Sequence, residues 1–153
     1  LMEGGYLFYL DESGQHGLVA ALDNLPETYE WGCYNYDEEV VGADATAIGM
    51  GYQNTIDIIY QGCETIYGGM TAAQAAFDFE VGAYTDWFLP SIDELELMYY
   101  SIGVIGQFGS YPSFWSSTES SNYGAFYMNF SQNIGVASTY KDNKYRVRPI
   151  RSF

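Results

Sequence analysis

One stretch of the sequence combines the residue types that make adaptable binding surfaces. Between Ser110 and Tyr145 there are eight serines, five tyrosines and four asparagines. Tyrosine supplies a large, rigid contact area at low entropic cost, and serine and asparagine adapt their hydrogen bonds, as in antibody combining loops. The candidate ligand-binding residues are Tyr123, Tyr127, Asn129, Ser131, Asn133, Ser138, Thr139, Tyr140, Asp142, Asn143 and Tyr145. The same composition is equally compatible with an ordinary polar strand-and-turn region.

Residues suited to catalysis are few and poorly placed. The single histidine, His16, lies in the glycine-rich run Gly14-Gln15-His16-Gly17, with no nucleophile motif near it. Asp93 and Glu94 fall where first-turn acids favour a helix dipole, which accounts for them better than a glycosidase pair does. We therefore expect a domain that is not an enzyme.

The candidate metal ligands are equally sparse. Cys33 and Cys63 do not form a CxxC motif, and with one histidine they do not complete a zinc site. The acidic run 37–39 together with Asp44 offers oxygen ligands for calcium, but it lacks a calcium-loop signature. We expect no cofactor, with a calcium site as the alternative to a solvated acidic loop. The two cysteines allow one disulfide at most, and the sequence leaves open whether it forms.

Charge is distributed unevenly along the chain. Residues 1–140 contain no lysine or arginine and 19 of the 20 acids, and the last thirteen residues hold five basic residues and one acid, a net +4 within a total of −15. So acidic a body repels phosphate backbones, which argues against nucleic-acid binding. We expect the basic tail to lie against the acidic body, with Arg146, Arg148 and Arg151 as scaffold cations paired with it.

Hydrophobic patterning indicates strands near both ends of the chain. The longest apolar runs are too short to span a membrane. Residues 6–10 and 18–22 read as strands, and residues 123–130 and 145–150 alternate as half-buried strands do. On strand 123–130 we expect Phe126, Met128 and Phe130 to face the core. This phase places Tyr127 and Asn129 outward, with Tyr123, Tyr140 and Tyr145 on the same exposed face. The first strand pattern begins almost at once with no signal peptide, so we expect the natural N-terminus to lie further upstream.

Capping patterns indicate three helices in the middle of the chain. Asn54 with Asp57, Thr71 with Gln74, and Ser91 with Glu94 each place a capping side chain three residues before an acid or amide. The expected helices cover about 54–61, 71–80 and 91–101. Strands at both ends with helices between them predict an α+β fold, in a single domain spanning residues 1–153.

Several sequence blocks resemble those of the DUF1566 family, which includes the C-terminal domain of the Legionella collagen-like adhesin. The most specific are DWFLPS at 86–91, WSSTE at 115–119 and the arginine-rich ending at 146–153. Further blocks in family order lie at 4–9, 16–20, 31–33, 42–44, 48–51, 54–55 and 94–95. A third cysteine often found in the family, near Ala76, is missing. We expect Trp87, Trp115 and Phe130 to be buried scaffold residues.

This resemblance implies a C-type lectin-like fold, with paired N- and C-terminal strands, two to three helices and a loop-rich ligand face. Related domains are the variable proteins of diversity-generating retroelements, in which Asn, Tyr, Ser, Asp and Thr vary on a fixed scaffold. Residues 121–145 have that character, between the blocks WSSTE and RVRP. Formylglycine-generating enzymes share the implied fold, but they need reactive cysteines near the substrate groove, and Cys33 and Cys63 lie in the wrong part of the chain for that role.

Three functions follow as hypotheses. The first is a target-recognition domain, extracellular and displayed on a cell surface or virion such as a phage tail, which binds a protein ligand through variable residues. The second is a carbohydrate- or glycosaminoglycan-binding adhesin module, although an acidic body fits glycosaminoglycans poorly. The third is a surface subunit that self-associates through its aromatic residues, and a homo-oligomer such as a trimer is compatible with any of them. A lectin-like fold alone does not establish sugar binding.

Overall fold

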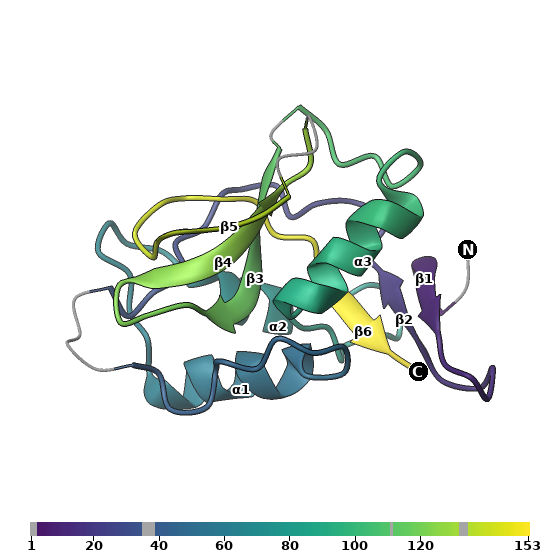
Figure 1. The fold of residues 1–153 in the computed structure, drawn as a ribbon, viewed down its shortest axis with the longest axis horizontal. Coiled ribbons are helices and arrows are strands. Elements are labelled where there is room, and N and C mark those ends of the chain that lie inside the picture. Colours follow the sequence, from purple (N-terminus) through teal and green to yellow (C-terminus); the bar gives the residue numbers. More distant parts are fainter. Residues whose placement is uncertain (1–2, 35–38, 111, 132–134) are drawn as a thin grey trace.

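The two ends of the chain meet in one antiparallel sheet. The computed structural model describes residues 3–34, 39–110, 112–131 and 135–153. Strands β1 (Tyr6–Leu10), β2 (Gly17–Ala20) and β6 (Ile150–Ser152) lie in the order β1-β2-β6, with Ala20 opposite Ile150 (Figure 1). The predicted pairing of N- and C-terminal strands is confirmed.

A second antiparallel sheet carries the candidate binding stretch. Strands β3 (Ser113–Glu119), β4 (Gly124–Asn129) and β5 (Gly135–Tyr140) follow one another in the sheet and in the sequence. The sequence patterns predicted β4 but neither β3 nor β5. The strand expected at 145–150 is reduced to β6 and single bridges such as Tyr29 with Tyr145. The fold is α+β, with two three-stranded antiparallel sheets.

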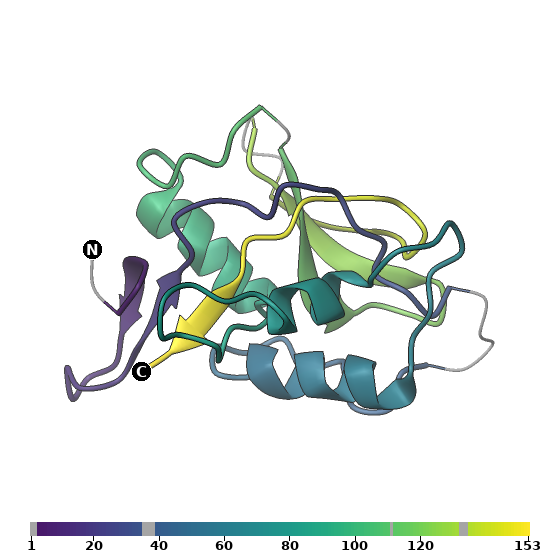
Figure 2. The ribbon, with the colours of Figure 1, turned by 180° about the vertical axis from the view of Figure 1, so that it is seen from behind.

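Three helices lie between β2 and β3 in the sequence: α1 (Gly51–Gln61), α2 (Ala72–Phe77) and α3 (Ile92–Ile102). Helix α3 contacts strands of both sheets, and α1 packs against α2 and β3 (Figure 2). Two of the predicted caps are confirmed. The Thr71 hydroxyl accepts a hydrogen bond from the Gln74 amide, and Ser91 forms a complete capping box with Glu94. No helix in the described ranges is both long and apolar enough to cross a membrane.

The third predicted cap, Asn54, is wrong. Helix α1 begins at Gly51, three residues earlier, and Asn54 is buried inside it, where its side chain donates to the Ala45 carbonyl. The start of α1 is instead held by Glu94, whose carboxylate accepts from the amides of Gly49 and Gly51, each at 3.1 Å. Burial raises the pKa of this carboxyl group. A contact across 43 residues replaces the local cap, so the capping pattern at Asn54 did not reveal it.

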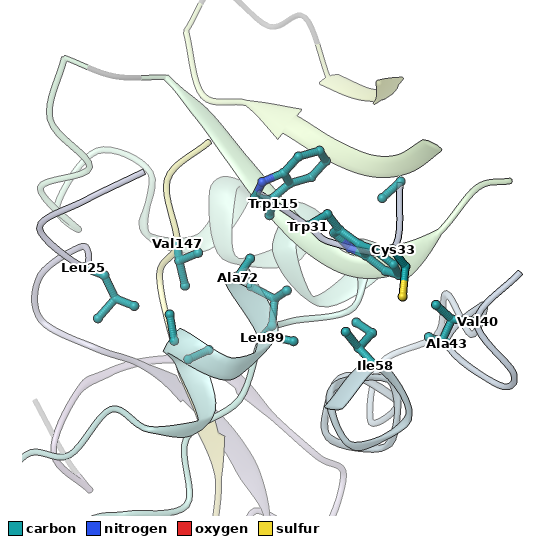
Figure 3. Close-up of a cluster of buried hydrophobic side chains, with 14 residues drawn as sticks. Leu25, Trp31, Cys33, Val40, Ala43, Ile58, Ala72, Leu89, Trp115 and Val147 are labelled. Atoms are coloured by element: carbon teal, nitrogen blue, oxygen red, sulfur yellow. The ribbon is translucent and has the colours of Figure 1, made fainter. Parts of the chain in front are cut away.

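The buried side chains form a core on each side of the second sheet. One cluster gathers around Trp31 and Trp115, with Ile58 from α1 and Val147 from the C-terminal segment (Figure 3). The other packs α3 against both sheets through residues such as Met98 and Met128. Trp87 and Trp115 are fully buried, as predicted, and Phe130 is partly buried against the second cluster.

A disulfide joins Cys33, in the segment between β2 and α1, to Cys63, two residues after the end of α1. Replacing both cysteines with alanine is expected to lower the free energy of unfolding by about 3–4 kcal/mol, because the bond closes a long loop in the unfolded chain. Urea denaturation of the variant and the wild type measures the difference. The wild type in reducing buffer is the control and should lose a similar amount. Equal midpoints for oxidised wild type and variant would contradict the prediction.

Candidate functional site

Three tyrosines from separate parts of the chain, two of them exposed and Tyr34 half-buried, form a cluster at one end of the second sheet. Tyr140 ends β5, Tyr123 precedes β4, and Tyr34 follows the disulfide-bonded Cys33. The Tyr34 ring meets those of Tyr123 and Tyr140 edge-on, with centroids 5.9 and 6.1 Å apart. Tyr123 is 46% exposed and Tyr140 is 63% exposed. We call these three residues the tyrosine cluster.

Polar side chains beside the tyrosine cluster are held by hydrogen bonds. The hydroxyl groups of Ser138, in β5, and Ser120, directly after β3, lie 2.5 Å apart. The Asn143 side chain donates to the Thr139 hydroxyl at 2.7 Å, and its backbone amide donates to the Tyr140 carbonyl. These bonds fix the turn after β5, in which Asp142 is half-buried.

A buried ion pair between Lys141 and Glu119 lies next to the tyrosine cluster, since Lys141 directly follows Tyr140. The Lys141 ammonium donates to Glu119 at 2.5 Å and to the Asn122 carbonyl at 2.8 Å, and it lies 4.8 Å from the centroid of the Trp31 ring. Both Glu119 oxygens also accept from the Val40 amide. Burial is the largest influence on the two groups, lowering the pKa of Lys141 and raising that of Glu119, and their mutual bond opposes both shifts. The pair joins β3, the turn before β4 and the end of β5.

Tyr127 and Tyr145 do not belong to this exposed face, which corrects the sequence prediction. Both are half-buried against Trp115: the Tyr145 ring centroid lies 4.8 Å from that of Trp115 and 4.7 Å from that of Tyr127. Burial also raises the pKa of Tyr127. The reason is that β4 is the central strand and both of its faces are covered. Alternation along it separates two cores, with Met128 on one side and Ala125 and Tyr127 on the other.

The remaining candidates lie toward the opposite end of β4. Asn129 accepts from the backbone amide and the hydroxyl of Ser131 at 2.8 and 2.7 Å. Asn133 lies outside the described residues. The structure therefore gathers Tyr123, Ser138, Thr139, Tyr140, Asp142 and Asn143 around one end of the sheet and places Asn129 and Ser131 elsewhere. Tyr34 was missed because its nearest signal, Cys33, indicated only a disulfide.

The basic tail lies against the body, but its partners differ from the prediction. Arg151 pairs with Asp86 at 2.7 and 3.0 Å and with Glu3, as expected, and this lowers the pKa of Asp86. Arg148 instead donates to the carbonyls of Ala21, Gly106 and Gln107 and to the Asn24 side chain. Burial lowers the pKa of Arg148 to about 10. Arg146 donates to backbone carbonyls, the nearest being Pro26 at 2.8 Å. A buried guanidinium is satisfied by backbone oxygens as well as by acids.

The metal-ligand candidates that the structure describes are not grouped together. Within the described ranges no three His, Cys, Asp or Glu side chains are grouped to hold a metal. Of the calcium candidates, Asp37 and Glu38 lie outside the described residues, and Glu39 and Asp44 are exposed. His16 is exposed in the turn between β1 and β2, where its carbonyl accepts from Asp11.

Comparison with known proteins gives a likeness of fold. No family model and no curated protein matches the sequence. A solved fimbrial protein from Bacteroides ovatus is similar to this chain with a TM-score of 0.53 and 17% sequence identity, over 88% of this chain. The similar region is 35% of the fimbrial protein, so this chain corresponds to about a third of it. At this identity the likeness concerns the fold alone.

Proposed function

We propose that this chain is a non-catalytic recognition domain, extracellular and displayed at a cell or virion surface, that binds a protein ligand through the tyrosine cluster. The observation that carries the proposal is a pair of exposed tyrosines, Tyr123 and Tyr140, that pack on the half-buried Tyr34, on a scaffold fixed by a disulfide and a buried ion pair. Exposed aromatic residues with adaptable polar neighbours on rigid supports are typical of combining sites.

The finer identity of the domain belongs to the same proposal. We propose that it is a DUF1566-type domain with a C-type lectin-like fold, and that residues 121–145 correspond to the variable segment of diversity-generating retroelement proteins. The pairing of β2 with β6 and the burial of Trp87 and Trp115 in the DWFLPS and WSSTE blocks support this. A nearby reverse transcriptase gene and a near-copy of the coding segment are the genomic signs expected.

Two observations support a place outside the cell. The disulfide suits an oxidising compartment, where such bonds form and persist. The protein whose fold is similar is a fimbrial protein, which is a surface structure. That likeness also favours a second candidate function, a surface subunit that assembles with other copies. Filaments in purified material would distinguish the second function from the first.

Alanine variants of the tyrosine cluster test the proposed function. Purified protein is screened against arrays of bacterial surface proteins and of glycans, and the hits are titrated with Tyr123→Ala, Tyr140→Ala and a control, Tyr100→Ala. Tyr100 is 71% exposed on α3, and the adjacent Tyr99 packs on Phe130, beyond the opposite end of β4. At least one of the two cluster variants is expected to weaken the free energy of binding by about 2 kcal/mol or more, as substitutions at hot spots do. All three variants should keep their stability within about 0.5 kcal/mol.

The possible outcomes separate the alternatives. Equal affinity of the wild type and both cluster variants for every hit would place the binding site elsewhere. Hits confined to the glycan array and abolished by a chelator would identify a calcium-dependent adhesin module instead. Loss of folding in Tyr123→Ala or Tyr140→Ala would show that the cluster is part of the scaffold.

A further inference from the structure

Each sheet has two outer strand edges, and three of these four edges are protected from pairing with a further strand. Strand β1 has a register shift between Leu7 and Tyr9, and β6 is three residues long and exchanges two backbone bonds with Phe88. The outer edge of β3 is covered by other segments, because Trp115 donates to the Arg146 carbonyl and Ser117 to the Pro90 carbonyl. Bulges, short strands and covering segments are the usual means of preventing further strand pairing.

The fourth edge, that of β5, has none of these protections from the residues that the structure describes. Its register with β4 runs without a shift from Gly135 to Tyr140, over six pairs. The strand contains no proline and no charged side chain, and Val136 and Tyr140 are 41% and 63% exposed. A straight, uncharged and exposed edge is a template for another strand.

The hydrogen-bond phase identifies which backbone groups face outward. Lys141 donates to the Tyr123 carbonyl, which marks the bonded phase of the β4–β5 ladder. Bonded and non-bonded pairs alternate in an antiparallel ladder, so residues 135, 137 and 139 bond to β4, and Val136, Ser138 and Tyr140 direct their amides and carbonyls away from it. The Tyr140 carbonyl accepts from Asn143, and in the described part of the chain nothing bonds to the outward groups of Val136 and Ser138.

The net charge of the chain limits what can occupy this edge. The chain carries −15; Lys141 and Arg148 are buried, Arg151 is paired with Asp86 and Glu3, and Lys144 is exposed after β5. The strongly acidic chain as a whole attracts a basic partner and opposes a second copy of itself.

We propose that the ligand is an extended polypeptide segment with basic side chains, which adds to the outer edge of β5 as a fourth strand and contacts the tyrosine cluster at its end. This inference rests on the proposed recognition function and specifies its ligand. Free amides and carbonyls two residues apart along a strand, at roughly 7 Å, match the spacing of a peptide backbone. Strand addition obtains affinity from such main-chain bonds and specificity from alternate side chains of the added peptide. On this edge the exposed Val136 and Tyr140 are the neighbours offered to those side chains.

A proline at position 138 tests the edge directly. Proline removes the outward amide of Ser138 and is tolerated on a strand where the amide faces away from the sheet. Ser138→Ala is the matched control, because it also loses the hydroxyl contact with Ser120 but keeps the amide. Thermal melting of both variants establishes that they are folded.

The probe is a phage-displayed library of random nonapeptides selected on the wild-type protein. Selected peptides should be enriched in lysine and arginine, and Ser138→Pro should weaken them by about tenfold or more through lost main-chain bonds, while Ser138→Ala stays within about threefold. Single N-methylation along a selected peptide should weaken binding at alternate positions only, because every second amide faces β5. This methylation scan also decides the question if Ser138→Pro does not fold.

Each of the other results would overturn a specific part of the proposal. Peptides that lose affinity for Tyr140→Ala, yet bind Ser138→Pro normally and show no alternation on methylation, would leave the recognition function standing and refute strand addition. A library without binders would refute strand addition by a basic segment, and glycan hits beside it would favour the adhesin module over protein recognition. Concentration-dependent dimers of the protein alone, abolished by Ser138→Pro, would assign the edge to a second copy. Peptides sensitive to Ser138→Pro but indifferent to Tyr123→Ala and Tyr140→Ala would support strand addition and refute the tyrosine cluster.

Discussion

Replacing Lys141 with methionine is expected to lower the free energy of unfolding by about 3–5 kcal/mol at neutral pH, because it leaves the Glu119 carboxylate buried without its cation. The side chains of Lys141 and Glu119 are 0% and 3% exposed, so water does not replace the lost ammonium. The variant also leaves the Asn122 carbonyl without this donor and removes the charge from the face of Trp31. Urea denaturation at pH 7 measures the loss.

The loss should depend on pH in a defined direction. Burial raises the pKa of Glu119 in the folded protein, and removing Lys141 takes away the bond that opposes this shift. A raised folded-state pKa gives a contribution to stability that is present below the unfolded pKa, about 4.3, and is lost as pH rises through the folded value. The deficit of Lys141→Met relative to wild type should therefore shrink toward pH 4.

A double variant separates charge from packing. Glu119→Gln combined with Lys141→Met removes both charges, so it should be more stable at pH 7 than Lys141→Met alone, and its deficit should vary little with pH. A Lys141→Met deficit below about 1 kcal/mol, or one equal at pH 4 and pH 7, would show that the pair lies in a more hydrated setting than the contacts indicate.

Local signals predicted the parts of the fold that depend on neighbouring residues. The caps at Thr71 and Ser91 act across three residues, and both were correct. The start of α1 was wrong because the group that holds it, Glu94, lies far along the chain and in another helix. Strands β3 and β5 were missed because serine, threonine and glycine dominate them, and their pairing with β4 supplies what their own pattern lacks.

The candidate site was predicted in part for a related reason. Alternation along β4 gave the correct phase, since Met128 and Tyr127 do point to opposite sides. The error lay in assuming that one side is solvent, which holds for a sheet with one covered face and fails for a central strand between two cores. Tyr34 approaches Tyr123 and Tyr140 only because the chain near Cys33 packs against the end of the second sheet. These contacts span 89 and 106 residues of sequence, and no local pattern reveals them.

Trp115 is a central residue of the core around Trp31, and truncating it to alanine is expected to cost about 3–5 kcal/mol of the free energy of unfolding. Its side chain is fully buried in the cluster around Trp31, and its indole nitrogen donates to the Tyr29 carbonyl at 2.6 Å (Figure 3). Tyr127 and Tyr145 pack on its ring, so the cavity would remove the support of both.

Trp115→Phe is the control that separates packing from hydrogen bonding. Phenylalanine fills most of the space, and the Tyr29 carbonyl still accepts from the Tyr145 amide at 3.0 Å, so no backbone oxygen is left without a donor. The phenylalanine variant should therefore lose about 1–2 kcal/mol, clearly less than the alanine variant. Denaturant unfolding measures both losses, and near-ultraviolet circular dichroism should report loosened tyrosines in Trp115→Ala only. Equal losses for the two variants would mean that the indole hydrogen bond, and not the packing of Tyr127 and Tyr145, fixes this layer of the sheet.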